Sequence, residues 1–269
     1  MTMQKHIMHS LRFAILLILL STLPAQAQQD TSKQITFENF GFSLNPDLAT
    51  NINIVQFPGD PTDEIYPGGP QPPHTQFLLY AEPPAPEFPL QSLATITVYA
   101  RGEMDGFEGH ARAAETLEAL LAERPNLSEF EQTRDSLSEI TLPFLPLWTG
   151  AQAIRARATY VDTDALNGIA YVTVYRQDVA PFLDYEFIYT FQGLSTDGTR
   201  YISMIMPVKA TMFPDSLPTD FDFEAFIPTM TAYFAESIDL LNAGSDDDFE
   251  PMLSLGTALV ESITTRSDV

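Results

Sequence analysis

Cysteine is absent from this chain of 269 residues, and positive charge is scarce. Without thiols the chain has no disulfide framework, no thiolate metal site and no cysteine nucleophile. Only 13 Lys+Arg stand against 36 Asp+Glu, which gives a formal net charge of −23. Because nucleic-acid binding relies on clustered cations that neutralise phosphates, we expect no nucleic-acid partner.

Familiar catalytic motifs are also absent. The sequence contains no H-E-x-x-H, no G-x-S-x-G, no P-loop and no G-x-G-x-x-G. Outside the first 27 residues there are two histidines, His74 and His110, and they have no metal-ligand spacing. A carboxylate-dependent hydrolase stays open as an alternative, but no catalytic pair can be selected among so many acids. The sequence therefore identifies no catalytic residue and leans towards a protein that is not an enzyme.

The first 27 residues have the pattern of a secretory signal peptide. Lys5 and Arg12 form a positively charged start, the apolar run 13–20 follows, and 25–27 reads Ala-Gln-Ala. The run is shorter than the ~20 residues that a membrane-spanning helix needs. We therefore expect cleavage after Ala27, secretion to an extracytoplasmic location, and membrane contact only if the segment stays uncleaved. Its removal takes the net charge from −23 to −25.

Hydrophobic periodicity predicts an α+β fold in which an antiparallel β-meander sheet packs against amphipathic helices. We expect one domain over 28–242, with a Pro-rich segment at 58–89 that holds ten of the 21 prolines, and a C-terminal helix docked on it within 243–269. Strands are predicted at 34–44, 75–80, 93–100, 152–161, 168–177, 185–193 and 200–208, and helices at 110–123, 221–241 and 251–263.

The turns suggest how the four consecutive strands of the meander pair. An Asp-Gly turn joins the last two, and this dipeptide is a strong signal for a two-residue hairpin. The turn predicts that Gln192 lies opposite Ser203. Centring the two earlier loops in the same way predicts that Val174 lies opposite both Ile188 and Arg155.

This register gives the meander two different faces. One face is aromatic, and we expect it to form the core under the 221–241 helix. The other is mixed, and we expect it to be half solvated or partly covered by the 110–123 helix. The aromatic face carries Tyr160, Tyr171, Tyr175, Tyr185, Phe187, Tyr189, Phe191, Met204 and Met206, and the mixed face carries Arg155, Arg157, Arg176, Glu186, Thr190, Gln192 and Ser203.

Arginines in the meander are the candidate ligand-binding residues. Arg155, Arg157 and Arg176 share the mixed face in this register, in a chain with few cations. Such a cluster would hold a carboxylate, a sulfate or an acidic loop of a protein partner. Cross-strand ion pairing, for example of Arg176 with Glu186, is the structural alternative.

A loop at 162–168 offers a candidate calcium site. Asp162, Asp164 and Asn167 resemble the start of a calcium-binding loop, although one residue is inserted and no Glu stands at the twelfth position. The same residues are typical of an ordinary hairpin turn. We expect no cofactor, with weak surface binding of calcium as the exception.

Four short segments of the chain have a recognisable pattern: 41–44 (GFSL), 143–146 (PFLP), 189–194 (YTFQGL) and 206–208 (MPV). They resemble segments of uncharacterised exported proteins of Chloroflexota-type bacteria. At the level of fold, the opening GFSL, the central meander and the late amphipathic helix are similar to PsbP/Mog1-like α/β/α sandwiches. That resemblance implies a binding or assembly module.

We therefore expect an extracytoplasmic, non-enzymatic binding or assembly module. Its partner would be an extracytoplasmic protein or a small anionic ligand. A carboxylate-dependent hydrolase and a weak calcium-binding surface protein are the alternatives.

Overall fold

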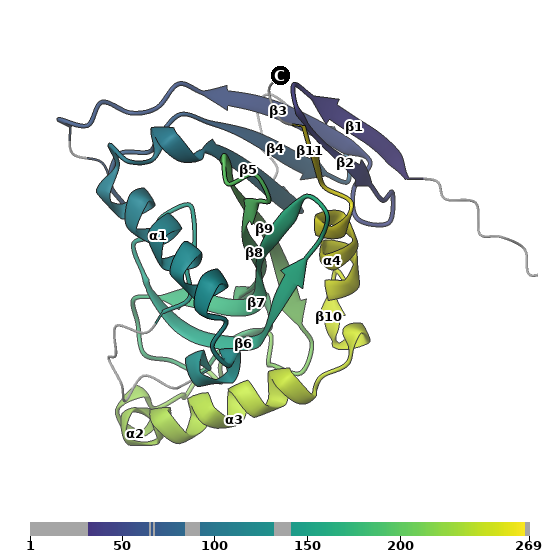
Figure 1. Cartoon of the computed structure of the whole chain (residues 1–269). Helices are drawn as coiled ribbons and strands as arrows, with labels where there is room; N and C mark the ends of the chain where they lie inside the picture. The colour runs from purple at the N-terminus through teal and green to yellow at the C-terminus, as the bar shows by residue number, and fades with distance from the viewer. Residues whose placement is uncertain (1–31, 65, 67, 84–91, 132–140, 267–269) are drawn as a thin grey trace, which may run out of the picture. The chain divides into compact units, whose positions relative to one another are not determined.

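The computed structural model describes residues 32–64, 66, 68–83, 92–131 and 141–266 (Figure 1). The predicted signal segment and part of the Pro-rich segment lie outside these ranges. No helix within the described ranges is long and apolar enough to cross a membrane.

A large antiparallel sheet forms the centre of the fold, as the sequence predicts. Its path runs β3-β4-β5-β9-β8-β7-β6, with β10 added beside β9. The last four strands in the chain before the late helices pair as the expected meander. The bounds are β3 (Asn51–Phe57), β4 (His74–Tyr80), β5 (Ala94–Ala100), β6 (Ala151–Asp162), β7 (Leu166–Arg176), β8 (Phe187–Ser195), β9 (Arg200–Ala210) and β10 (Phe249–Glu250).

A second, three-stranded sheet has the order β1-β2-β11 and joins the two ends of the described chain. Thr264 of β11 lies opposite Gly41 of β2. Because this pairing ties the C-terminal segment to the first hairpin, the late helix is held at both ends. The bounds are β1 (Lys33–Phe37), β2 (Phe40–Leu44) and β11 (Thr264–Thr265).

Four α-helices and several 3₁₀ turns complete the described part of the fold. The predicted 221–241 helix is interrupted at Pro228, which lacks the amide hydrogen that a continuous helix needs. It appears as a short helix, a 3₁₀ turn and a longer helix. The bounds are α1 (Glu108–Glu123), α2 (Phe223–Phe226), α3 (Met230–Ala243) and α4 (Leu253–Glu261), with 3₁₀ turns η1 (Arg101–Glu103), η2 (Leu127–Phe130), η3 (Asp184–Glu186), η4 (Ile227–Thr229) and η5 (Asp246–Asp248).

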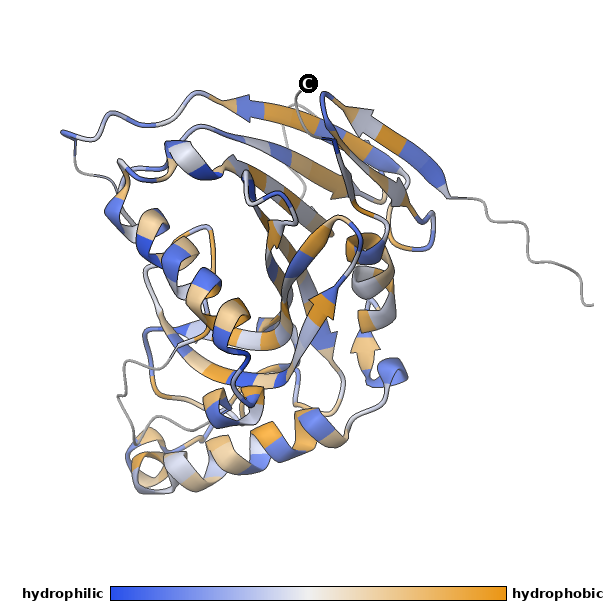
Figure 2. Ribbon diagram, in the orientation of Figure 1, coloured by the Kyte–Doolittle hydropathy of each residue, from blue (hydrophilic) through white to orange (hydrophobic). Residues whose placement is uncertain are grey.

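Helices cover both faces of the central sheet (Figure 1). On one side, here called the α1 face, Ala114, Leu117 and Leu120 of α1 pack on the sheet. Hydrophobic and hydrophilic residues alternate along α1 in Figure 2, as expected for a helix with one face on a sheet. The other side, here called the α4 face, is covered by α3, α4 and the three-stranded sheet. Each face therefore has its own hydrophobic core.

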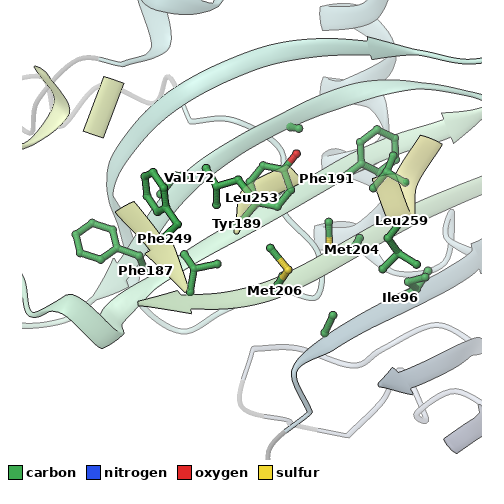
Figure 3. Close-up of a cluster of buried hydrophobic side chains, with 14 of the residues drawn as sticks. Ile96, Val172, Phe187, Tyr189, Phe191, Met204, Met206, Phe249, Leu253 and Leu259 are labelled. Atoms are coloured by element: carbon green, nitrogen blue, oxygen red, sulfur yellow. The ribbon is translucent and has the colours of Figure 1, made fainter. Parts of the chain in front are cut away.

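The core of the α4 face contains most of the buried phenylalanines among the described residues. Figure 3 shows Tyr189, Phe191, Met204 and Met206 gathered with Leu259 of α4. The close approach of α4 requires glycine at 256, because an added Cβ there would lie 2.7 Å from the Tyr189 ring.

The predicted register is confirmed for the last hairpin and wrong for the two earlier loops. Gln192 lies opposite Ser203, as expected from the Asp-Gly turn. Thr173, not Val174, lies opposite Ile188, which is a shift of one residue. Thr173 also lies opposite Arg155. Because side chains alternate across a strand, this shift moves every residue of β7 to the other face.

The predicted placing of the β7 tyrosines on the core face is therefore incorrect, whereas the expected cover of the mixed face by the 110–123 helix is confirmed. Tyr171 and Tyr175 lie on the α1 face beside Gln192, and Tyr160 packs on that side as well. Tyr185 lies in η3 and is exposed. The mixed face is not half solvated, because α1 and the segment 141–150 bury it.

Candidate functional site

A cavity of about 470 Å³ opens on the α1 face, where α1 meets the start of β6 and the end of β7. Its third wall is the segment 141–150, here called the connector. The lining combines three aromatic side chains, three arginines and one acid: Phe144, Trp148, Tyr175, Arg112, Arg155, Arg176 and Asp178. A concave site with apolar walls and a few polar groups is the usual form of a small-molecule site.

Buried polar side chains of the sheet hold the connector in place. The Gln152 side chain accepts from the Leu142 amide at 3.0 Å. The Tyr171 hydroxyl donates to the Pro143 carbonyl at 2.7 Å. Further along, Gln192 accepts from the Leu145 amide at 3.0 Å. Because these partners stand on strands, they fix the backbone of an otherwise irregular segment.

Gln192 is the centre of this network. It is fully buried and also accepts from the Tyr201 hydroxyl at 2.8 Å. Its amide nitrogen donates to Thr190 at 2.8 Å and to Ser203 at 3.0 Å. A fully satisfied network of this kind specifies one arrangement of the connector, since any other leaves polar groups unpaired. The network thereby positions Phe144 and Trp148 at the cavity.

Trp148 forms the exposed aromatic wall of the cavity. Its ring is stacked on Tyr175, with centroids 5.9 Å apart and an angle of 22°. Tyr175 in turn packs on Phe144 at 4.6 Å and receives a hydrogen bond from Gln152. Trp148 keeps 52 % of its surface exposed. The indole is therefore packed on the Tyr175 ring while about half of its surface stays exposed.

Arg155 and Arg176, two of the three predicted ligand-binding arginines, line this cavity. Arg155 donates to the carbonyl oxygens of Phe130 and Gln152, and burial lowers its pKa. Arg176 pairs with Glu186 at 2.8 Å, as the structural alternative predicts, and with Asp178 at 3.4 Å. Both guanidinium groups are thus held in fixed positions by the protein.

Arg157 does not join this pair, so the predicted cluster of three arginines on one face is wrong. It sits at a bulge of β6 with a φ of 56°. Its side chain donates to the carbonyl oxygens of Leu241 and Gly244, at the end of α3. The bulge turns Arg157 towards the α4 face, where it lies over the Phe249 ring.

Arg112 takes the place that the sequence assigned to Arg157. It lies on α1, lines the cavity, and keeps 71 % of its side chain exposed. Its partner is Glu108, one helical turn earlier, at 2.5 Å. An exposed ion pair at this spacing stabilises a helix by about 0.3–0.5 kcal/mol. The Arg112–Glu108 pair therefore costs little free energy to break.

The predicted calcium residues stand in a hairpin turn, where one of them is engaged in an ion pair. Asp162 forms a two-point ion pair with Arg124, with the shorter contact at 2.7 Å, and this hydrogen bonding lowers its pKa. Within the described ranges no three or more His, Asp or Glu side chains form a metal-binding group. The 162–168 segment has the geometry of a hairpin turn, with Asp162 opposite Asn167, and Asp164 offers its carbonyl to Thr196.

The two histidines lie close together in the core beside this site. Tyr99 stands between them, with its ring centroid 5.1 Å from His74 and 5.6 Å from His110. His74 contacts the Pro72 carbonyl at 2.8 Å through Nδ1. Burial lowers the pKa of both histidines, to about 4 for His110. They do not line the cavity described above.

Sequence reasoning missed Trp148, Tyr175 and Arg112 as site residues. The register predicted from the loops places Tyr175 in the core, and Arg112 stands on a helix rather than in the meander. The available signal is the apolar connector, which contains the only tryptophan of the chain. Comparison with protein families, curated proteins and solved structures finds no match. The interpretation of the cavity therefore depends on its geometry.

Proposed function

We propose that this chain is an extracytoplasmic, non-enzymatic binding module that holds a small anionic ligand in the cavity between α1 and the connector. The observation that carries the proposal is the exposed guanidinium of Arg112 in the cavity, held only by an exposed ion pair with Glu108. Arg155 and Arg176 also belong to the described lining, in a chain with a net charge of −23. The extracytoplasmic location rests on the signal pattern of residues 1–27.

The walls of the cavity support binding of a small molecule. Its volume of about 470 Å³ lies within the range of roughly 300–1,000 Å³ usual for such sites. Positive groups in a partly desolvated cavity also attract anions more strongly than groups in open water, because the local dielectric is lower. An anion would thus be favoured here although the rest of the surface repels it.

The lining favours binding over carboxylate-dependent hydrolysis. Glycoside-type hydrolysis uses a pair of carboxyl groups, one acid and one base or nucleophile. Among the described residues that line the cavity, Asp178 is the single acid. Its side chain is 72 % exposed and pairs with Arg176 at 3.4 Å, so the described lining lacks the second carboxyl group that such a reaction uses.

The single tryptophan provides a direct test, because all indole fluorescence of the secreted chain comes from Trp148 at the cavity. We would titrate the chain from Gln28 with sulfate, succinate, benzoate and glucuronate at constant ionic strength. The expected result is a saturable change in emission for at least one of these anions. No saturable response to any of them would refute the proposal.

Two matched variants of α1 separate binding at the site from general charge effects. Arg112→Gln removes a cation from the cavity, whereas Arg124→Gln removes one from the end of the same helix, where it pairs with Asp162. Loss of a charge-assisted hydrogen bond costs about 1.5–3 kcal/mol, so Arg112→Gln should weaken the anion about tenfold or more. Arg124→Gln should leave the affinity unchanged, and equal weakening by both would contradict the proposal.

A further inference from the structure

Trp148 is an aromatic platform that the protein supports but does not cover. Stacking on Tyr175 and an edge contact with Phe144 at 6.4 Å hold the ring from one side. Phe144 is itself buried, and the Gln192 network fixes the connector, to which Phe144 and Trp148 belong. A supported aromatic face on a cavity wall suits a flat or ring-shaped group, because stacking is optimal when the receiving ring is already oriented.

Arg112 stands close to this platform because α1 and the connector touch. Gly109 packs on Leu147, and a Cβ at position 109 would lie 2.4 Å from Leu147 Cδ1. Arg112 follows Gly109 by one helical turn, and Trp148 follows Leu147 directly. The glycine thus lets the helix approach until an exposed guanidinium and an exposed indole line the same cavity.

Arg112 is suited to the acidic part of a ligand. A guanidinium matches a carboxylate with two parallel hydrogen bonds. The Glu108 partner of Arg112 is 88 % exposed, so solvent replaces it at low cost when a ligand takes over the pairing. Arg155, a buried arginine, belongs to the same lining.

From this juxtaposition we infer that the cavity takes a ring-bearing carboxylate, with the ring on the Trp148 indole and the carboxylate on the Arg112 guanidinium. The inference rests on the proposed function, since it assigns a ligand class to the same cavity. Two sources share this chemistry, an aromatic acid and an acidic sugar. Neither an open-chain acid nor a neutral ring would use both contacts.

Calorimetric titration of the chain from Gln28 tests the inference with four probes. Benzoate and glucuronate carry both features, succinate carries carboxylates without a ring, and glucose carries a ring without a charge. We expect at least one of the first two to bind about tenfold more tightly than succinate and glucose, as one added contact of about 1.4 kcal/mol requires. The better of the two identifies the source of the ring.

Variants of three exposed side chains connect the affinity to the two contacts. Trp148→Leu and Arg112→Gln should each weaken the preferred ring carboxylate about tenfold. Tyr185→Leu removes an exposed aromatic ring that does not line the cavity, and should leave the affinity unchanged. Trp148→Phe keeps a smaller stacking surface and should give an intermediate affinity, which tests the platform even if the leucine variant folds poorly.

The outcomes separate this inference from the proposed function. If succinate binds as tightly as the ring carboxylates, the cavity is an anion site and the ring contact is refuted. If glucose binds as tightly as glucuronate, the carboxylate contact is refuted. If none of the four calorimetric probes binds but sulfate gives a saturable response in the fluorescence titration, the ligand class is wrong while anion binding stands. If no anion binds, both the inference and the proposed function are overturned.

Discussion

His110 lies in the first turn of α1 with 1 % of its surface exposed. Neither of its ring nitrogens has a hydrogen-bond partner among the described residues. The ring faces Tyr99 and Phe107, with His74 beyond Tyr99. Burial, and to a smaller extent the proximity of His74, lowers its pKa to about 4. A positive charge here would also oppose the dipole at the start of the helix. His110 should therefore make the protein sensitive to acid.

The size and sign of the effect follow from proton linkage. The unfolded chain binds a proton on this residue near pH 6.5, whereas the folded protein does so only near pH 4. The unfolded state thus gains protons first as the pH falls, so stability falls between about pH 6.5 and 4 and is unaffected above that window. The difference between the two pKa values corresponds to about 3 kcal/mol lost by pH 4.

The assay is urea unfolding of wild type and His110→Leu between pH 7 and pH 4 at constant ionic strength. Leucine has a similar volume and no polar atoms, so at pH 7 the variant should be at least as stable as the wild type. The difference in unfolding free energy should then grow by about 3 kcal/mol towards pH 4. Comparing the two chains cancels the response of the many carboxylates, which they share.

His74→Leu is the matched control. Burial lowers the pKa of His74 as well, but its bond to the Pro72 carbonyl and the nearby Asp60 act in the opposite direction. Its contribution to acid sensitivity should therefore be smaller than that of His110. Parallel stability curves for wild type and His110→Leu across the whole pH range would refute the reasoning.

Two further substitutions test the packing that shapes the site. Gln192→Leu leaves buried amide and hydroxyl partners unpaired, so it should destabilise the fold by about 2–4 kcal/mol in urea unfolding. Gln177→Leu, on an exposed side chain, should change stability by less than about 0.5 kcal/mol. Gly256→Ala forces a methyl group to within 2.7 Å of Tyr189 and should cost about 1–3 kcal/mol. Gly102→Ala, where an added Cβ meets nothing within 4 Å, should lower the melting temperature far less.

The elements of the fold were predictable because their signals are local. Alternating apolar residues and an Asp-Gly turn specify the β8–β9 hairpin, and the pairing of Gln192 with Ser203 follows from the turn alone. Helical periodicity likewise indicated α1 and α3. Each of these signals spans a few residues, so no knowledge of distant contacts was needed.

The sequence did not predict which side chains of β7 lie on which face of the sheet. The loop 177–186 has no two-residue turn, and η3 lies at its end, so several registers satisfy the same hydrophobic pattern. The structure selects the register in which Tyr171 reaches the Pro143 carbonyl and Tyr175 packs on Phe144. Both partners belong to the connector, which the sequence places on no strand or helix.

The candidate site depends still more on tertiary contacts. The bulge at Arg157 removes one predicted arginine from the site, and α1 supplies another, Arg112. Residues 141–150 form a wall of the cavity because two buried side chains, Gln152 on β6 and Gln192 on β8, bind their backbone. By itself the sequence determined the acidic composition, the absence of thiol chemistry and the α+β antiparallel architecture. Tertiary packing alone decided which side chains meet at the cavity, because that meeting is set by register, bulges and long-range hydrogen bonds that no local pattern encodes.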